Sequence, residues 1–167
     1  MRHDVRMSDD TWTERDDVHR HFDALPEGHP ARVVRAFQVL AMVDDYSIEE
    51  LTQLVTPESR GCWGDFSTEH QYFADQAFAI SVGAYRHVGA EDVAYVTLSP
   101  DTGEYYQEGG LTGEVAHVTL VWRPELGGWR IDQLGYPAPP PYVPRTSKPS
   151  DAPRYDTDAM VEIVADD

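Results

Sequence analysis

The stretch 111–136, LTGEVAHVTLVWRPELGGWRIDQLGY, constrains the fold of this chain more than any other part of it. Two runs, 113–123 and 129–134, alternate in period two and are rich in β-branched and aromatic residues. Between them lies the glycine-containing turn 124–128. This pattern is typical of a β-hairpin, so we expect the two runs to pair as antiparallel strands.

The first run of this hairpin divides its side chains between two faces, because successive strand residues point to opposite sides of a sheet. We expect the helices to cover the more apolar set: Ala116, Val118, Leu120 and Trp122. The opposite set, His117, Thr119 and Val121, puts β-branched residues on an outer face, which indicates a covered surface. We therefore expect these three residues to form an interface with a second copy of the chain, in a homodimer.

Helical patterns precede the strands. Pro30 suits the first turn of a helix, and apolar residues at helical spacing follow it as far as Ala41. Ser47 and Glu50 match a Ser-x-x-Glu capping box at the start of a second helix. Pro57 should end that helix, because the residue before a proline is pushed out of the α region.

A third helix and further strands are expected between these helices and the hairpin. Thr68 is the expected cap of this helix, which should run to about Phe78. Alternation over 80–88 and the β-rich run 93–99 indicate strands, and 104–107 is expected to return as a short one. Helices followed by strands predict an α+β fold, with two to three N-terminal helices packed on a curved antiparallel sheet.

Composition divides the chain into three parts. Residues 1–29 are rich in acids and arginines and poor in apolar residues, so they are expected to be mobile. Residues 30–136 form the expected α+β domain, and 137–167 an extended, proline-rich acidic tail outside the core. We expect this tail to tether its terminal apolar residues to a protein partner, and its removal to leave folding intact.

The charge balance limits the partners. Thirteen Lys and Arg against 30 Asp and Glu give a net charge of −17, which argues against nucleic acid or an anionic membrane surface as a partner.

No apolar run approaches the length of a membrane span, and the N-terminus lacks the apolar stretch of a secretory signal, so a cytoplasmic location is expected. Cys62 is the single cysteine, and the irregularly spaced histidines that include His29 do not predict a metal site. No metal or other cofactor is expected.

Two stretches resemble a known superfamily: 31–55 for the paired helices, and 115–135 for the closing hairpin with its W-x-I-x-x-L-G ending. The chain over roughly 31–136 resembles the nuclear transport factor two-like superfamily, which includes polyketide-cyclase-like proteins, ketosteroid isomerase and scytalone dehydratase. The combination of LVTPESRGCWGDF and VTLVWRPELGGWRIDQLG looks like actinobacterial members of that group. The resemblance implies a cone-shaped fold in which a bent sheet curls around the helices and leaves a pocket.

Pocket chemistry of the acid-base type needs a carboxylate or histidine beside an apolar wall, so that its pKa moves towards the working pH. The ionisable candidates are Asp65, Glu69, His70, Tyr72, Tyr95, His117 and Asp132. Asp65 and His70 could meet as a dyad, with Tyr95 as a third group, but a helix-leading turn for Asp65 and a solvent-facing His70 fit the pattern as well.

Aromatic residues are the candidates for the wall of a pocket: Tyr46, Trp63, Tyr72 and Trp122. Aromatic residues at these spacings are more often plain core than the lining of a pocket. No motif specifies a reaction. The sequence therefore favours a non-catalytic domain that binds a small ligand or a protein and dimerises through its sheet. The alternative is a cofactor-free acid-base enzyme of the dehydratase, isomerase, cyclase or epoxide-hydrolase type, with Asp65, His70 and Tyr95 as catalytic residues.

Overall fold

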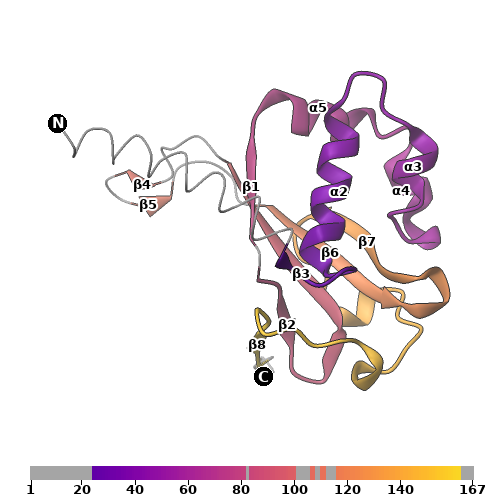
Figure 1. The fold of residues 1–167 in the computed structure, drawn as a ribbon, viewed down its shortest axis with the longest axis vertical. Helices are drawn as coiled ribbons and strands as arrows, with labels where there is room; N and C mark the ends of the chain where they lie inside the picture. The colour runs from indigo at the N-terminus through magenta and orange to yellow at the C-terminus, as the bar shows by residue number, and fades with distance from the viewer. Residues whose placement is uncertain (1–23, 82, 101–105, 108–109, 112–115, 163–167) are drawn as a thin grey trace.

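The structure is a computed structural model that describes residues 24–81, 83–100, 106–107, 110–111 and 116–162. It is an α+β fold in which helices lie on one face of a six-stranded mixed sheet (Figure 1). Among the described residues four α-helices lead to the sheet: α2 (Pro30–Met42), α3 (Ile48–Thr52), α4 (Arg60–Trp63) and α5 (Ser67–Asp75). No helix in the described ranges has both the length and the apolar character that a membrane span requires.

The helix boundaries follow local chemistry. Helix α2 begins at Pro30 as predicted, and the Ser47 side chain accepts a hydrogen bond from the Glu50 amide at 3.2 Å to cap α3. Thr68 is not the cap of α5, because the helix starts one residue earlier and the Asp65 carboxylate accepts from the Ser67 amide at 3.0 Å. Helix α5 also ends at Asp75, earlier than expected.

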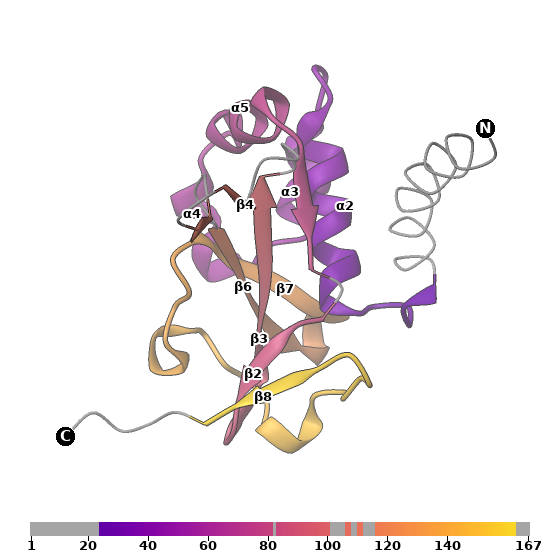
Figure 2. The same ribbon diagram turned by 90° about the vertical axis from the view of Figure 1, so that its left-hand side faces the viewer.

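The strands are β1 (Phe78–Ile80), β2 (Tyr85–His87), β3 (Ala90–Pro100), β6 (Ala116–Arg123), β7 (Gly128–Gly135) and β8 (Ala159–Val161). They are ordered β7-β6-β3-β2-β8, and β1 pairs with the far end of β3. A separate pair consists of β4 (Tyr106–Gln107) and β5 (Gly110–Leu111). The sheet is mixed, not antiparallel as predicted, because β8 runs parallel to β2 (Figure 2).

The predicted hairpin is confirmed where the structure describes it. Strands β6 and β7 pair antiparallel, with Trp122 opposite Trp129, across a turn in which Gly127 and Gly128 have positive φ. The register shifts along β7, so that Gln133 lies opposite Thr119 and Ile131 opposite Leu120. Asp132 is therefore the extra residue of a β-bulge.

The two faces of the sheet are both buried. The helix-covered face carries Val118 and Leu120 as predicted, in the same core as Phe37 of α2. The Phe37 ring lies 5.6–6.1 Å from the rings of Trp63, Phe66 and Phe73, which joins α2 to α4 and α5. The opposite face forms a second, smaller core of Val93, Tyr95 and Val121 with Ala138 and Val143.

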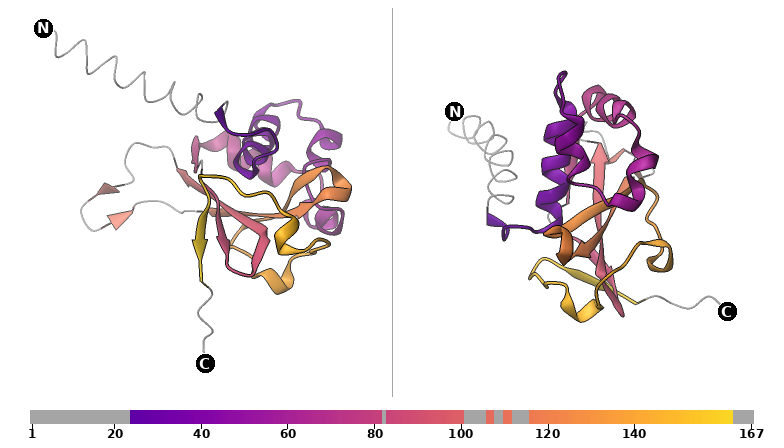
Figure 3. Two further views of the ribbon diagram at one scale, coloured as in Figure 1. Left: turned by 60° about the horizontal axis from the view of Figure 1, so that its bottom comes forward. Right: turned by 90° about the vertical axis from the view of Figure 1, so that its right-hand side faces the viewer.

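That second core is closed by residues 137–162, here named the C-terminal segment, which crosses the face of the sheet opposite the helices (Figure 3). Ala138 and Val143 are each only 6% exposed, so the expectation of a tail outside the core was wrong. Proline has no amide hydrogen to pair. A proline-rich stretch can therefore cover a sheet face without joining its hydrogen-bond ladder.

Polar contacts fix the C-terminal segment on the sheet. The Tyr95 hydroxyl donates to the Ala138 carbonyl at 2.6 Å, and the Ala138 amide donates to the Thr119 hydroxyl at 3.0 Å. Further along, Arg145 donates two hydrogen bonds, both 2.7 Å, to the fully buried carboxylate of Asp92. Strand β8 then adds Ala159–Val161 to the edge of β2, so these residues are part of the sheet.

His29 is another departure from the sequence prediction. The predicted mobile segment 1–29 lies mostly outside the described residues, but His29 is fully buried and is the N-cap of α2. Its Nδ1 accepts from the Ala31 amide at 3.1 Å, and its Nε2 lies 3.0 Å from the Thr157 hydroxyl in the C-terminal segment. With Nδ1 as acceptor, Nε2 carries the hydrogen and donates to Thr157.

This geometry makes His29 sensitive to acid. Burial, with the charges of Arg86 and Arg32, lowers its pKa to about 4. The unfolded chain, with a histidine pKa of about 6.5, takes up the proton first, so stability is lost as pH falls from about 6.5 towards 4. His29→Asn keeps a cap acceptor but cannot titrate. We expect the stability difference between the two chains to shift by about 2–3 kcal/mol between pH 7 and 4.5.

The measurement is urea unfolding of both chains at several pH values. Other groups with shifted pKa, including Glu69, Asp132 and Asp158, titrate alike in the two chains and cancel in the difference. Parallel pH profiles would show that His29 takes up its proton as easily folded as unfolded, and the prediction would be wrong.

Candidate functional site

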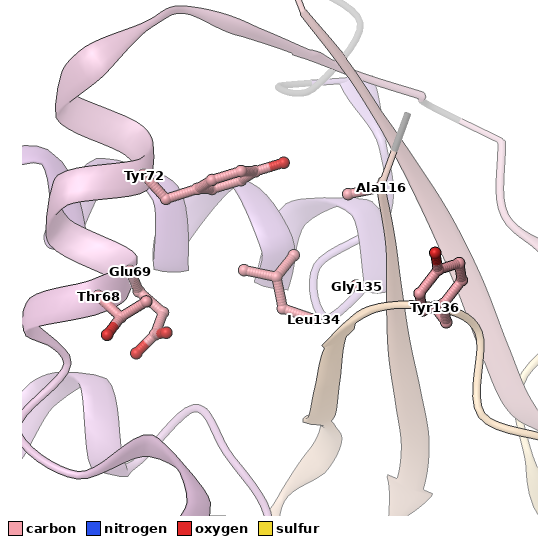
Figure 4. A pocket seen from close by; sticks show the side chains of 7 residues that line it. All are labelled: Thr68, Glu69, Tyr72, Ala116, Leu134, Gly135 and Tyr136. Atoms are coloured by element: carbon pink, nitrogen blue, oxygen red, sulfur yellow. The ribbon is translucent and has the colours of Figure 1, made fainter. Parts of the chain in front are cut away.

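A pocket of about 510 Å³ opens between α5 and the ends of the β6–β7 hairpin (Figure 4). We name it the α5 pocket, and its described wall consists of Thr68, Glu69, Tyr72, Ala116, Leu134, Gly135 and Tyr136. Its size falls within the range of small-molecule sites, roughly 300–1,000 Å³.

Helix α5 supplies the polar side of this pocket. Thr68 and Tyr72 are four residues apart and therefore share one face of the helix, with Glu69 beside them. The start of the helix is fixed by the hydrogen bond from the Ser67 amide to Asp65 and by the N-cap residue Phe66, which is 2% exposed and has a left-handed φ of 63°. The anchored Phe66 sets the face that α5 turns towards the hairpin.

The hairpin supplies the apolar side. In an unbroken strand residues 131 and 134 would point to opposite faces, since side chains alternate. The bulge at Asp132 removes one step of this alternation, so Ile131 and Leu134 both pair with residues of the helix-covered face. Leu134 is thereby directed towards α5, as Figure 4 shows. Gly135, with φ 133°, then turns the chain to the exposed Tyr136.

Glu69 is the chemically distinctive residue of the α5 pocket. Burial raises the pKa of its carboxyl above the usual value, and the charge of Asp65 acts in the same direction. Its Oε1 atom is buried and has no hydrogen-bond partner within the described part of the chain. Buried acceptors normally have a partner, so this carboxylate is one that a bound molecule with a hydrogen-bond donor would stabilise.

The predicted Asp65–His70 dyad does not form. The Asp65 carboxylate accepts a hydrogen bond from the amide of Ser67, the first residue of α5, and this hydrogen bond lowers its pKa. Nδ1 of His70 donates to the Ala41 carbonyl at 2.7 Å, while its Nε2 lies 3.9 Å from the exposed carboxylate of Asp44. Both side chains therefore have structural partners of their own.

Tyr95 is not near this pair. It lies on the opposite face of the sheet in the second core, where its hydroxyl donates to the Ala138 carbonyl. Burial raises the pKa of Tyr95 to about 12, so its phenol stays neutral. The three predicted catalytic residues therefore do not share a cavity.

Of the four aromatic residues predicted to bind a ligand, Tyr72 lines the α5 pocket. Tyr46 donates to the Asp65 carbonyl at 2.9 Å and stacks on His70 with ring centroids 5.0 Å apart. Trp63 and Trp122 belong to the helix-side core, where the Trp122 ring contacts that of Trp129 at 5.5 Å. For these three residues core packing is the better description.

The predicted dimer interface is also corrected. Thr119 and Val121 have no exposed surface, because the C-terminal segment of the same chain covers them. His117 is half-buried on this face and lies edge-on to Tyr85 at 6.1 Å. The pattern correctly indicated a covered surface, but the cover comes from the same chain.

A second hollow, of about 360 Å³, lies between β7 and the C-terminal segment. Asp132 lines it and accepts a 2.7 Å hydrogen bond from the Thr56 hydroxyl, while burial raises its pKa. Among the described residues, no group of three or more His, Cys, Asp or Glu is arranged to hold a metal ion. Asp132 thus has a structural partner, whereas Glu69 Oε1 has none in the part of the chain that the structure describes.

No family model, curated protein or solved structure matches this chain. The site must therefore be argued from geometry. Helical spacing alone could have grouped Thr68, Glu69 and Tyr72, but Leu134 could not be placed with them because its direction depends on the bulge.

Proposed function

We propose that this protein binds a small, largely apolar molecule in the α5 pocket, without chemical conversion. The pocket itself carries the proposal. Its walls combine Ala116, Leu134 and the Tyr72 ring with a few polar groups, the mixture typical of small-molecule sites. The hydrogen bonds that fix Asp65 and His70 leave both to a structural role.

We also propose that the fold is the cone-shaped, nuclear transport factor two-like arrangement. Helices that precede the strands and cover one sheet face support it, as does a pocket between helix and hairpin. The chain after α3 supports it further, since the Thr56 amide donates to the Ile131 carbonyl at 2.8 Å and closes the outer edge of β7. Homodimer formation, now through a surface other than Thr119 and Val121, and a cytoplasmic location stay predictions.

Filling the α5 pocket tests the binding function. Leu134→Trp adds bulk where the hairpin faces α5, and we expect it to weaken binding of an apolar probe at least tenfold, or by about 1.4 kcal/mol. Indole-3-ethanol is a suitable neutral probe, measured by isothermal titration calorimetry. The matched control is Val39→Trp, which adds the same bulk on α2 at a residue that is 45% exposed and outside the pocket.

Circular dichroism should first show that both variants are folded. Binding to the parent chain that Leu134→Trp weakens and Val39→Trp leaves unchanged would support the proposal. Equal affinity of both variants, or no binding of indole-3-ethanol to the parent chain, would reject it.

The raised pKa of Glu69 favours one alternative, a cofactor-free acid-base enzyme that acts in the same pocket. Such an enzyme would use Glu69 as general acid or base, with the phenol of Tyr72 on the same wall. It would not use the predicted set of Asp65, His70 and Tyr95. Turnover of a bound ligand that Glu69→Gln abolishes would favour this alternative over simple binding.

A further inference from the structure

The partnerless carboxylate oxygen of Glu69 determines what kind of molecule the α5 pocket suits. Oε1 is buried and has no hydrogen-bond partner among the described residues, while Ala116, Leu134 and the Tyr72 ring supply apolar surface to the same pocket. A buried acceptor without a donor is unfavourable, so a ligand gains affinity if it brings the missing donor. The ligand should therefore carry a hydrogen-bond donor beside an apolar body.

The charges around the pocket decide between a neutral and a cationic donor. No lysine, arginine or histidine is present in its described wall, and the nearest charge acting on Glu69 is the carboxylate of Asp65. Thr68, Tyr72 and Tyr136 contribute neutral hydroxyl groups. The whole chain has a net charge of −17, which attracts cations and repels anions.

We propose that the α5 pocket selects an organic cation, an ammonium group attached to an apolar body, and that the ammonium pairs with the Glu69 carboxylate. This inference rests on the proposed binding function and adds the charge of the ligand to it. A hydrogen bond between an ammonium and a carboxylate is shorter and stronger than one between neutral groups. An alcohol of the same shape can fill the pocket but cannot form this charge-assisted hydrogen bond. A carboxylate ligand is repelled by the negative charge of the site.

The shifted pKa of Glu69 agrees with this geometry. Burial and Asp65 both favour the protonated acid in the free protein, whereas a bound ammonium stabilises the carboxylate. Amine binding should therefore weaken as pH falls through the pKa of that group, and at pH values near that pKa it should release a proton from Glu69. Binding of a neutral ligand should show neither effect.

Three probes of nearly equal size test the charge: indole-3-ethylamine, indole-3-ethanol and indole-3-propionate. With the full chain, calorimetry is expected to give the amine at least tenfold higher affinity than the alcohol, and the propionate the weakest binding. Titrations in two buffers of different ionisation enthalpy will show the released proton. Glu69→Gln should bring the amine down to the affinity of the alcohol and abolish the proton release.

Glu49→Gln is the matched control, since it removes one negative charge from an exposed position on α3 outside the pocket. It should keep the preference for the amine. If Leu134→Trp weakens the alcohol but the amine binds no tighter than the alcohol, the pocket binds ligands and the cation inference is wrong. Tightest binding of the propionate, or an amine preference that Glu69→Gln leaves intact, would also overturn it. If no probe binds, the binding function itself fails.

Discussion

Removal of residues 137–167 is expected to abolish the cooperative fold of this protein. The truncation exposes the second core, in which Val93, Tyr95 and Val121 pack against Ala138 and Val143. It leaves the Tyr95 hydroxyl without its acceptor at Ala138. These losses occur over the middle of the sheet, on β3 and β6, and not at a frayed edge.

The lost ion pair adds the largest single cost. Asp92 has no exposed surface and holds the Arg145 guanidinium through two hydrogen bonds. Breaking a buried pair by removing one partner costs about 3–5 kcal/mol. Here the Asp92 carboxylate must then take up a proton or draw water to the region that the truncation uncovers. A typical domain has only about 5–15 kcal/mol of stability, so this loss and the exposed core together should exceed it or nearly so.

Thermal unfolding followed by circular dichroism is the measurement, with proton NMR to detect a folded core. A shorter truncation that removes only residues 163–167 is the control, because every contact named above remains in it. We expect the control to unfold like the full chain. If the chain that ends at Tyr136 shows an unchanged melting temperature, the C-terminal segment is a dispensable tail, as its composition alone predicts.

The composition of the C-terminal segment led to a wrong prediction, because composition describes the segment alone and not the distant residues that it contacts. Seven of the twelve prolines lie at 137–153, which predicts an extended chain. What holds that extended chain is non-local, since Arg145 meets Asp92 and Ala138 meets Tyr95 only after the sheet has formed. The β-branched pattern of the outer face did predict a cover, but no periodicity states which segment provides it.

Local sequence patterns predicted the helices and strands better than they predicted the place of the C-terminal segment. Period-two alternation located the hairpin and the residues that face the helices, and the proline at residue 30 and the Ser47 cap located two helix starts. The candidate site could not be predicted from local patterns alone. Thr68, Glu69 and Tyr72 are readable from helical spacing, but Leu134 reaches them through a bulge that reverses its expected face.

Asp158→Ala is expected to have the second large effect on stability. Asp158 lies 2.9 Å from the guanidinium of Arg86, which has no exposed surface. That guanidinium lies over the ring of Trp129 at 5.0 Å and that of Tyr155 at 5.6 Å. It joins the C-terminal segment, strand β2 and the hairpin in one contact.

The two partners depend on each other unequally. Burial lowers the pKa of Arg86, and the charge of Asp158 is the largest influence that opposes this effect. Burial raises the pKa of Asp158, whose carboxylate is held first by the Tyr155 amide at 2.8 Å and then by the charge of Arg86. Arg86 also donates to the Glu91 carbonyl at 3.2 Å, but Asp158 is the nearest anion to its guanidinium. Asp158→Ala leaves a buried, unpaired guanidinium and should cost about 3–5 kcal/mol.

Urea unfolding of four chains measures this coupling: the parent, Asp158→Ala, Arg86→Met and the double variant. Arg86→Met should cost less than Asp158→Ala, because a lone aspartate can take up a proton whereas an arginine cannot lose one. The double variant should be more stable than Asp158→Ala, since it also removes the unpaired charge of Arg86.

Arg154→Ala is the control: its 3.6 Å contact with Glu91 is solvent-exposed on the arginine side and is worth at most about 1 kcal/mol. Strictly additive single effects, or a cost of Asp158→Ala no larger than that of Arg154→Ala, would show that this buried pair does not hold the C-terminal segment on the sheet.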